Sequence, residues 1–168
     1  MANQELDREL HRVALTAIIH KDGKYLITQR SPHKKAFPGL WTVPGGGLHP
    51  DDYTAQPETY PKQWYMGVES SLRREVSEEV GLTIGKPKFL LDIVLIRPDG
   101  IQVVVLSYYA EYVSGEVKLD DESTASAWVS YEEAKSYDLI PGILGELEMV
   151  ERLLAGEDAA DVGYRVHK

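Results

Sequence analysis

The sequence predicts an α/β (α+β) domain in which a mixed β-sheet is flanked by helices. Two observations support this class. Apolar runs typical of strands occur as hairpin-like pairs, and helical apolar patterns follow each pair along the chain. The first pair is joined by Asp22-Gly23 and the second by Pro98-Asp99-Gly100, both of which are turn sequences. Because the early strands are linked as hairpins, a doubly wound parallel sheet is not expected.

The composition is typical of a soluble globular protein with one core. The chain has 168 residues, 43% hydrophobic and 27% charged, which suits one domain over residues 1–168. A net charge of −9 leaves no basic footprint for nucleic acid. The absence of cysteine excludes disulfides, thiolate ligands and a cysteine nucleophile, and favours a cytoplasmic protein. No apolar run approaches the ~18 residues of a membrane span, so no membrane partner is expected.

In the first part of the chain, short strands lead to a glycine-rich turn. A polar lead-in over residues 1–10 comes first, and strands are expected over residues 13–20, 24–30 and 41–43. The last of these ends at Pro44-Gly45-Gly46-Gly47. Residues 48–65 contain three prolines and several aromatic residues. This stretch is too long for a bare connector, so we expect an irregular loop insertion that shapes or covers a site.

A central helix is expected to begin between Pro61 and Val68, with Pro61 in its first turn, and to end before Gly81. The elements expected after it are strands over 88–96 and 102–113, an acidic loop over 115–125, a strand over 127–129, a short helix to about 137, a longer helix over 143–154 and a tail over 156–168. Ser130 and Glu133 have the spacing of a capping box at the start of the short helix.

The central helix carries an unusual acidic face. At about 100° per residue, Glu75, Glu78 and Glu79 fall within one arc, beside an apolar stripe that includes Val76. Like charges at these spacings repel by roughly 0.2–0.5 kcal/mol per pair, and the last turn of a helix favours cations. A divalent cation would turn this penalty into a binding site, since Mg²⁺ prefers carboxylate oxygens. A solvated acidic face with arginine partners is the alternative interpretation.

The sequence resembles the Nudix hydrolase (MutT-like) family in two blocks. Pro44-Gly45-Gly46 matches the family's Pro-Gly-Gly, and residues 74–82 match Arg-Glu-apolar-any-Glu-Glu-any-Gly-apolar at every fixed position. Residues 127–133 also resemble the family's surroundings, so that the resemblance covers roughly residues 12–153. It implies an α/β/α sandwich with a mixed β-sheet. The implied activity is hydrolysis of a diphosphate linkage in a nucleotide or nucleoside diphosphate derivative.

The sequence departs from the family signature at the entry to the helix. The signature is Gly, five residues, Glu, seven residues, then Arg. Gly46 and Arg74 are 28 positions apart, about 14 more than the signature has, and we assign the extra length to residues 48–65. Counting back eight positions from Arg74 places Met66 where the first glutamate belongs, while Glu69 comes three places late. We therefore expect reduced or reshaped support of the helix carboxylates.

The resemblance implies a metal centre on the helix. Mg²⁺ or Mn²⁺ would be held by Glu75, Glu78, Glu79 and the backbone carbonyl of Gly45, or that of Gly46. Arg74 would brace the carboxylates through charge-assisted hydrogen bonds, although it projects about 100° away from Glu75 around the helix.

Further residues are expected around the metal. Glu122, with Asp120 and Asp121 as alternates, would bind metal or act as a general base, and its other interpretation is an acidic loop tip. Arg30 is a candidate phosphate clamp, or else a surface arginine. Trp64 and Tyr65 are candidates to stack on the substrate, whereas Trp41 is expected in the core.

Two other functions are weighed against this one. A non-catalytic Nudix-fold nucleotide-binding module is the main alternative, since Met66 and the insertion could mark lost catalysis. Residues 36–42 also resemble isopentenyl-diphosphate isomerases, but those enzymes need a cysteine that this chain lacks. The expected partner is a small nucleotide or diphosphate, and the resemblance allows a homodimer. Nucleoside triphosphates, sugar nucleotides, dinucleotides and non-nucleotide diphosphates all remain open as substrates.

Overall fold

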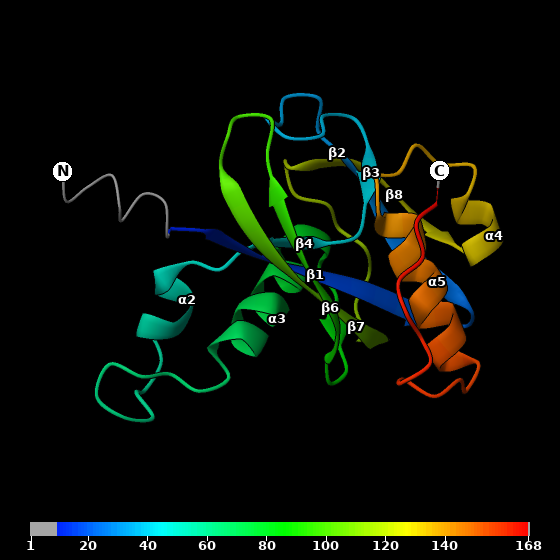
Figure 1. The fold of residues 1–168 in the computed structure, drawn as a ribbon. Coiled ribbons are helices and arrows are strands. Elements are labelled where there is room, and N and C mark those ends of the chain that lie inside the picture. Colours follow the sequence, from blue (N-terminus) through cyan, green and yellow to red (C-terminus); the bar gives the residue numbers. More distant parts are fainter. Residues whose placement is uncertain (1–9, 168) are drawn as a thin grey trace.

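The computed structural model describes residues 10–167, in which an eight-stranded sheet lies between helices (Figure 1). Residues 1–9 of the predicted lead-in lie outside this range. The strands are β1 (Arg12–Lys21), β2 (Lys24–Arg30), β3 (Trp41–Thr42), β4 (Gly45–Gly47), β5 (Thr83–Ile84), β6 (Lys88–Ile96), β7 (Gln102–Ser114) and β8 (Ser123–Val129). The helices are α2 (Pro50–Thr54), α3 (Gly67–Val80), α4 (Tyr131–Ala134) and α5 (Ile143–Leu154).

The sheet is mixed and is centred on β1. Along one edge β1 runs parallel to β7, from the pair Arg12–Val103 to the pair His20–Glu111. Along its other edge it pairs antiparallel with β2 and β4. β6 pairs antiparallel with β7, and β8 pairs antiparallel with β2. The prediction of a hairpin-linked mixed sheet, rather than a doubly wound one, is confirmed.

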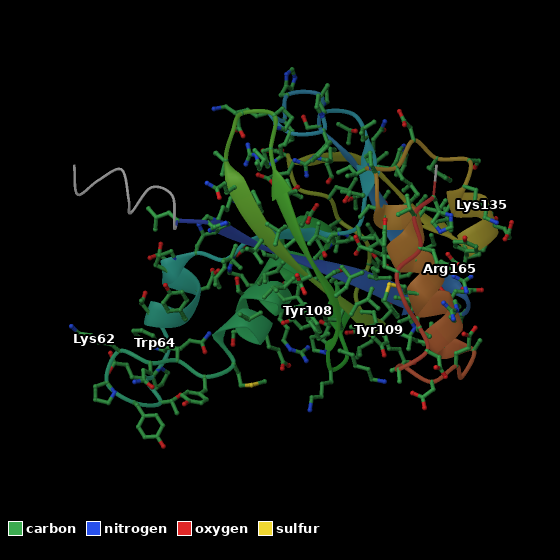
Figure 2. All side chains as sticks on the ribbon, viewed as in Figure 1. Lys62, Trp64, Tyr108, Tyr109, Lys135 and Arg165 are labelled. Atoms are coloured by element: carbon green, nitrogen blue, oxygen red, sulfur yellow. The ribbon has the colours of Figure 1, made fainter. Side chains whose placement is uncertain are left out.

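Two apolar cores lie on the two faces of the sheet, because alternate residues of a strand point to opposite sides. Leu15 of β1 packs in one core with Leu72 and Val76 of α3. Ile18 of β1 packs in the other core with Leu147 of α5. Successive residues of β7 divide in the same way, since Tyr108 joins the α3 core and Tyr109 the α5 core (Figure 2). The predicted α/β/α sandwich is therefore confirmed.

The boundaries of α3 follow from two residues with left-handed backbone conformations. Met66, with φ of 63°, immediately precedes the first helical residue. Gly81, with φ of 70°, follows the last, and its N–H donates to the Ser77 carbonyl over 3.0 Å. The predicted end of the helix is confirmed. The prediction of Pro61 in its first turn is wrong, since the helix begins only at Gly67.

Several local predictions differ from the structure. The stretch 48–65, predicted to be irregular, contains α2 next to α3 (Figure 1). Its helix is short and starts on a proline, so it lacks an apolar period that could have revealed it. β4 consists of three glycines and carries no strand pattern. β8 begins four residues earlier than predicted, and α4 ends at Ala134 rather than near residue 137. The capping box of Ser130 and Glu133 and the bounds of α5 are confirmed.

The C-terminal tail lacks regular structure, as predicted, and runs back along α5 (Figure 1). Val162 of the tail is buried. Gly145 of α5 lets the tail approach, because a Cβ at this glycine would lie 2.6 Å from the carbonyl oxygen of Arg165. In residues 10–167, every helix is too short or too polar to cross a membrane.

Candidate functional site

The glycine strand β4 lies directly against two carboxylates of α3. The Gly45 N–H donates to Glu79 Oε2 over 2.7 Å. A Cβ on Gly46 would lie 2.2 Å from Glu75 Oε2, and one on Gly45 would lie 2.1 Å from the Leu15 carbonyl oxygen. Real Cβ atoms do not approach other atoms so closely. The glycines of β4 therefore allow the backbone to meet the helix carboxylates, as expected of a residue without a side chain.

Glu79 is a buried carboxyl at the centre of this contact. The residue is 8% exposed, and Ser123 Oγ donates to its Oε1 over 3.3 Å. Burial, reinforced by the negative charges of Asp120 and Glu122, outweighs the hydrogen bonds and raises its pKa to about 7. A bound cation would reverse this penalty, because an opposite charge favours the ionised carboxylate.

Arg74 holds three carboxylates at once. Its Nε donates to Asp52 Oδ1 over 2.6 Å, its Nη2 to Glu75 Oε1 over 2.7 Å and its Nη1 to Glu78 Oε2 over 2.5 Å. The expectation that Arg74 projects away from Glu75 is wrong, since a guanidinium on a long stem reaches neighbours that its Cβ direction does not face. These hydrogen bonds raise the pKa of Arg74 further above its usual range.

Asp52 is a site residue that the sequence reasoning missed. Its side chain is 5% exposed and accepts hydrogen bonds from Arg74, from the Ser71 hydroxyl and from the His49 N–H. Although burial acts in the opposite direction, these hydrogen bonds lower its pKa to about 2. The Asp52 carboxylate is therefore fixed in its ionised form beside Arg74.

Asp52 also corrects the alignment to the family signature. Counting forward from Gly46, five residues and then an acidic residue, leads to Asp52. Counting back from Arg74 led to Met66, which is exposed and precedes α3. The chain thus keeps a carboxylate in the first acidic position, and the extra residues follow it, over 53–66 instead of 48–65. The forward count was the signal available in the sequence.

The helix carboxylates have the chemistry of a metal site but are not gathered into one. In residues 10–167 no three acidic or histidine side chains converge as ligands. Glu75 and Glu79 both border β4, whereas Glu78 turns to Arg74 with its side chain 62% exposed. Carboxylate oxygens beside an open backbone suit Mg²⁺ or Mn²⁺. Glu78 would have to turn from Arg74 towards β4 to join Glu75 and Glu79.

A cavity of about 270 Å³ opens beside β4 and is bordered by all three of its glycines. Residues of β1, β6 and β7 line one side of it, and Ile143 and Glu146 of α5 line another, called here its α5 end. Cationic side chains reach it from several elements: Arg12, Arg30, Lys34 and Arg97. The arrangement of apolar side chains with converging charged groups is typical of a small-molecule site.

Besides Gly45, two of the predicted site residues, Arg30 and Glu122, line this cavity. The Nε of Arg30 donates to the Ala36 carbonyl over 3.0 Å, which fixes the direction of its guanidinium. Glu122 forms an ion pair with Lys34 across the rim. Its backbone N–H donates to the side chain of Asp120 over 2.9 Å, so the acidic loop is internally ordered.

The predicted aromatic residues are placed differently. Trp64 lies on the segment after α2 (Figure 2), where its ring packs against Tyr53 at 5.2 Å between centroids. Tyr65 is 67% exposed, and neither Trp64 nor Tyr65 borders the 270 Å³ cavity. Their role in substrate binding stays a prediction. Trp41 packs edge-on against Tyr137 at 4.8 Å in the α5 core, as expected.

The α5 end of the cavity contains polar residues that the sequence reasoning did not identify. Glu146 is 2% exposed and binds the hydroxyl of Ser107 on β7. Burial outweighs this hydrogen bond and raises its pKa to about 7. The available signal was its spacing, since Glu146 shares the buried face of α5 with Ile143 and Val150.

No protein-family model matches the chain. The nucleoside triphosphatase NudI of Klebsiella pneumoniae (strain 342) is 29% identical over 138 residues, which cover 76% of this chain and 88% of that protein. A MutT NUDIX hydrolase from Burkholderia pseudomallei is 25% identical, with a TM-score of 0.66 over 83% of this chain and 97% of that one. The NUDIX domain of Shewanella oneidensis NrtR, complexed with ADP ribose, shares the fold: its TM-score is 0.66 at 19% identity, over 86% and 89% of the two chains.

These similarities extend well beyond the short signature. They cover 76% of the chain in the sequence comparison and 83% in the structural one. The resemblance predicted from the glycine turn and the acidic helix is therefore confirmed. The chain is therefore similar in both sequence and fold to Nudix hydrolases, among them a nucleoside triphosphatase.

Proposed function

We propose that this protein is a pyrophosphohydrolase that requires Mg²⁺ or Mn²⁺ and cleaves a diphosphate linkage in a nucleotide or nucleoside diphosphate derivative. The observation that carries the proposal is the packing of Glu75 and Glu79 against β4, whose glycines border a cavity with four cationic side chains. The names of similar proteins support the substrate class, since one is a nucleoside triphosphatase and another was solved with ADP ribose.

The carboxylates of α3 would hold the metal together with the Gly45 or Gly46 carbonyl, whose approach no side chain blocks. A bound ion neutralises phosphate oxygens and lowers the pKa of coordinated water. Arg74 holds Glu75 in place beside Gly46, and Asp52 fixes Arg74 in turn. This supporting chain of hydrogen bonds orients ligands before any ion arrives, as outer residues of metal sites do.

The cavity residues would bind and orient the diphosphate. Arg30 faces it with a guanidinium that the Ala36 carbonyl already orients, and a planar fork of donors suits phosphate oxygens. Glu122 lies on the same wall and would accept a proton from the attacking water once phosphate competes for its partner Lys34. Trp64 and Tyr65 would contribute only if the segment after α2 moved towards the cavity.

A substrate panel with two metals tests this function. Nucleoside triphosphates, ADP-ribose, a sugar nucleotide and a dinucleoside polyphosphate are incubated with Mg²⁺ or Mn²⁺, and the products are separated by anion-exchange chromatography. We expect a nucleoside monophosphate product with at least one substrate, and none with chelator present. Glu78→Gln should abolish turnover and keep the fold. Glu132→Gln is the matched control, because Glu132 is an exposed glutamate of α4 whose ion pair within residues 10–167 is with Lys135.

Two results would contradict the proposal. Full activity of Glu78→Gln would mean that the α3 carboxylates do not hold the ion. Binding of Mg²⁺ and nucleotide, measured by calorimetry, without turnover of any substrate would instead support the nucleotide-binding module. The ion pairs of Arg74 with Glu75 and Glu78 are the observation that keeps this alternative in view.

A further inference from the structure

The α5 end of the cavity contains a buried carboxyl group with few polar partners. Glu146 forms no ion pair within residues 10–167, and its side chain bonds only to the Ser107 hydroxyl. Burying an acidic group is unfavourable unless partners satisfy it. The carboxyl nevertheless faces a cavity instead of solvent. Such a group is costly as a core residue and useful as a ligand contact.

A second polar group beside it has no hydrogen bond. Thr16 Oγ1 is buried and unpaired within the described part of the chain, and Thr16 lines the same cavity. Thr16 pairs with Ser107 across β1 and β7, so the two hydroxyl-bearing residues occupy one face of the sheet. The surrounding wall is aliphatic and includes Ile93 and Val105. A few polar groups that lack hydrogen-bond partners, placed among apolar side chains, are the usual arrangement for fixing a ligand's orientation.

The strand register places these groups at a definite distance from the metal-binding edge. Thr16 pairs with Gly45 on one side and with Ser107 on the other. Neighbouring strands are about 4.8 Å apart, so the β4 and β7 backbones in this row lie about 10 Å from each other. A nucleoside spans this interval with its phosphates at β4 and its base at β7.

We propose that Glu146 is a specificity-determining residue that hydrogen-bonds the polar edge of the substrate's nucleobase, assisted by Thr16 and Ser107. The inference rests on the proposed function, since it assumes that phosphates bind at β4. The aliphatic wall fits the faces of a planar heterocycle, and the polar residues meet its edge. The cationic residues of the cavity remain for the phosphates, because a neutral base gives them no charge to bind.

The protonation of Glu146 determines which base edge it matches. A neutral carboxyl offers one donor and one acceptor, which match the adjacent donor and acceptor of adenine, cytosine or uracil. An ionised carboxylate offers acceptors alone, which match the two adjacent donors of guanine. Burial raises the Glu146 pKa to about 7, so both forms exist near neutral pH. The charged and titratable side chains around it are Arg12, Arg30, Lys34, Arg97 and Glu122 in the cavity and Tyr164 of the tail.

Substitution of Glu146 tests the proposal against a base-free substrate. kcat/KM is measured for ATP, GTP, CTP, UTP and ribose 5-triphosphate with the wild type and with Glu146→Leu, Glu146→Gln and the control Glu132→Gln. We expect Glu146→Leu to reduce the spread between the best and worst nucleotide by about 10- to 100-fold, the usual effect of a lost hydrogen bond to a buried group. Ribose 5-triphosphate should be cleaved equally by all four proteins. Glu146→Gln should keep the wild-type ranking at pH 6, since an amide also offers one donor and one acceptor.

The ratio of GTP to ATP provides a second readout. In the wild type we expect kcat/KM for GTP relative to ATP to rise between pH 6 and pH 8.5, and in Glu146→Gln to stay constant. A ratio taken at one pH cancels any effect of pH on the metal centre. If the GTP-to-ATP ratio were the same in the wild type and in Glu146→Gln at both pH values, the proposal that the Glu146 carboxyl binds the base edge would be overturned.

Other outcomes separate this inference from the proposed function. An unchanged ranking in Glu146→Leu, or an equal loss with all five substrates, would overturn the inference and leave the hydrolase intact. If the wild type cleaves none of the five, calorimetry with adenosine, guanosine, cytidine and uridine without metal decides the inference alone. The proposed function fails only if the other substrates of its panel are not cleaved either. Selective nucleoside binding that disappears in Glu146→Leu would support it. Equal binding, or none, would overturn it.

Discussion

Two regions with carboxyl groups, one that reaches the cavity through the β4 glycines and one that lines it through Glu146, are built in opposite ways. The first is the glycine edge, formed by β4 and the α3 carboxylates. There the hydrogen bond from Arg74 helps to hold the pKa of Asp52 at about 2, despite burial. At the α5 end, the Ser107 hydroxyl is the single hydrogen-bond partner of the Glu146 side chain within residues 10–167, and the pKa of Glu146 lies at about 7. The difference separates two uses of a buried acid. A fully paired carboxylate maintains a structure, whereas an under-paired one keeps capacity for a ligand.

Glu79 provides the largest test of this comparison, because it is an under-paired acid at the glycine edge. We expect Glu79→Gln to lower kcat by about 10³-fold or more, since a metal ion contributes several kcal/mol to catalysis. Its melting temperature should not fall, because the substitution removes a buried acid and retains a polar amide. Steady-state kinetics with Mg²⁺ and thermal unfolding without Mg²⁺ measure the two effects, because a bound ion would itself stabilise the wild type. More than a tenth of wild-type activity would show that Glu79 is not a ligand.

Glu146 provides the next largest effect, on stability. Its folded pKa of about 7 lies above the ordinary value of 4.5, so ionisation favours the unfolded chain. The resulting loss of stability is absent below pH 4.5, grows up to pH 7 and is constant above. Glu146→Gln should therefore gain up to about 3 kcal/mol relative to the wild type between pH 5 and pH 8. Urea unfolding at the two pH values measures this gain. If the free energies of unfolding of Glu146→Gln and the wild type differed equally at pH 5 and at pH 8, Glu146 would not titrate in this range.

The two regions also differ in how far the sequence predicted them. The acidic face of the central helix follows from periodicity, and the Nudix signature assigns it to a metal. Periodicity likewise shows that Glu146 lies on the buried face of α5. It does not show what Glu146 meets, because Ser107 is 39 positions away along the chain. That contact depends on the β1–β7 register, which no local pattern encodes.

The same reasoning explains the missed parts of the glycine edge. β4 has no side chains and so gives no alternation to detect. Asp52 was overlooked because counting back from Arg74 assumes a signature of fixed length, and an insertion breaks that assumption. Loops accept insertions readily, since the entropy of closing a loop grows slowly with its length. The strands β1, β2, β6 and β7 were predicted closely because they are long and apolar.

Asp52→Asn tests the paired side of the comparison, with a smaller effect. Its folded pKa of about 2 lies below the ordinary value of 3.8, so its ionisation stabilises the fold above pH 3.8, and this contribution is lost as the pH falls towards 2. We expect a loss of about 2 kcal/mol at pH 7 and a 10- to 100-fold lower activity, as for other supporting residues of metal sites. Urea unfolding and steady-state kinetics at pH 7 measure these losses.

Met66→Ala is the matched comparison for Asp52, because Met66 occupies the first acidic position when the signature is counted back from Arg74. Met66 is exposed, so we expect a change within about 0.5 kcal/mol, as for other surface substitutions, and nearly full activity. The reverse result, a harmless Asp52→Asn and a damaging Met66→Ala, would restore the first alignment.

The smallest effects are expected in the inserted segment, which stands outside both regions. Trp64 packs on Tyr53, and its Nε1 donates to the Gln56 carbonyl, so its contacts remain local. We expect Trp64→Ala to expose residues 53–66 to protease. We expect Trp64→Ala and Tyr65→Ala to change kcat/KM by less than about 3-fold, because neither ring borders the 270 Å³ cavity. Limited proteolysis and steady-state kinetics on the best nucleotide measure the two effects.

A clear effect of Trp64→Ala and Tyr65→Ala on substrate binding would add the inserted segment to the two regions compared above. A KM raised more than about 10-fold by both substitutions, with kcat unchanged, would mean that the segment reaches the bound nucleotide, since a stacked base is worth about 1–3 kcal/mol. The predicted role of Trp64 and Tyr65 in substrate binding would then be right. Combining each with Glu146→Leu would show whether they act on the same base, because two residues that hold one base give non-additive losses. Independent losses would place the two aromatic rings on another part of the substrate.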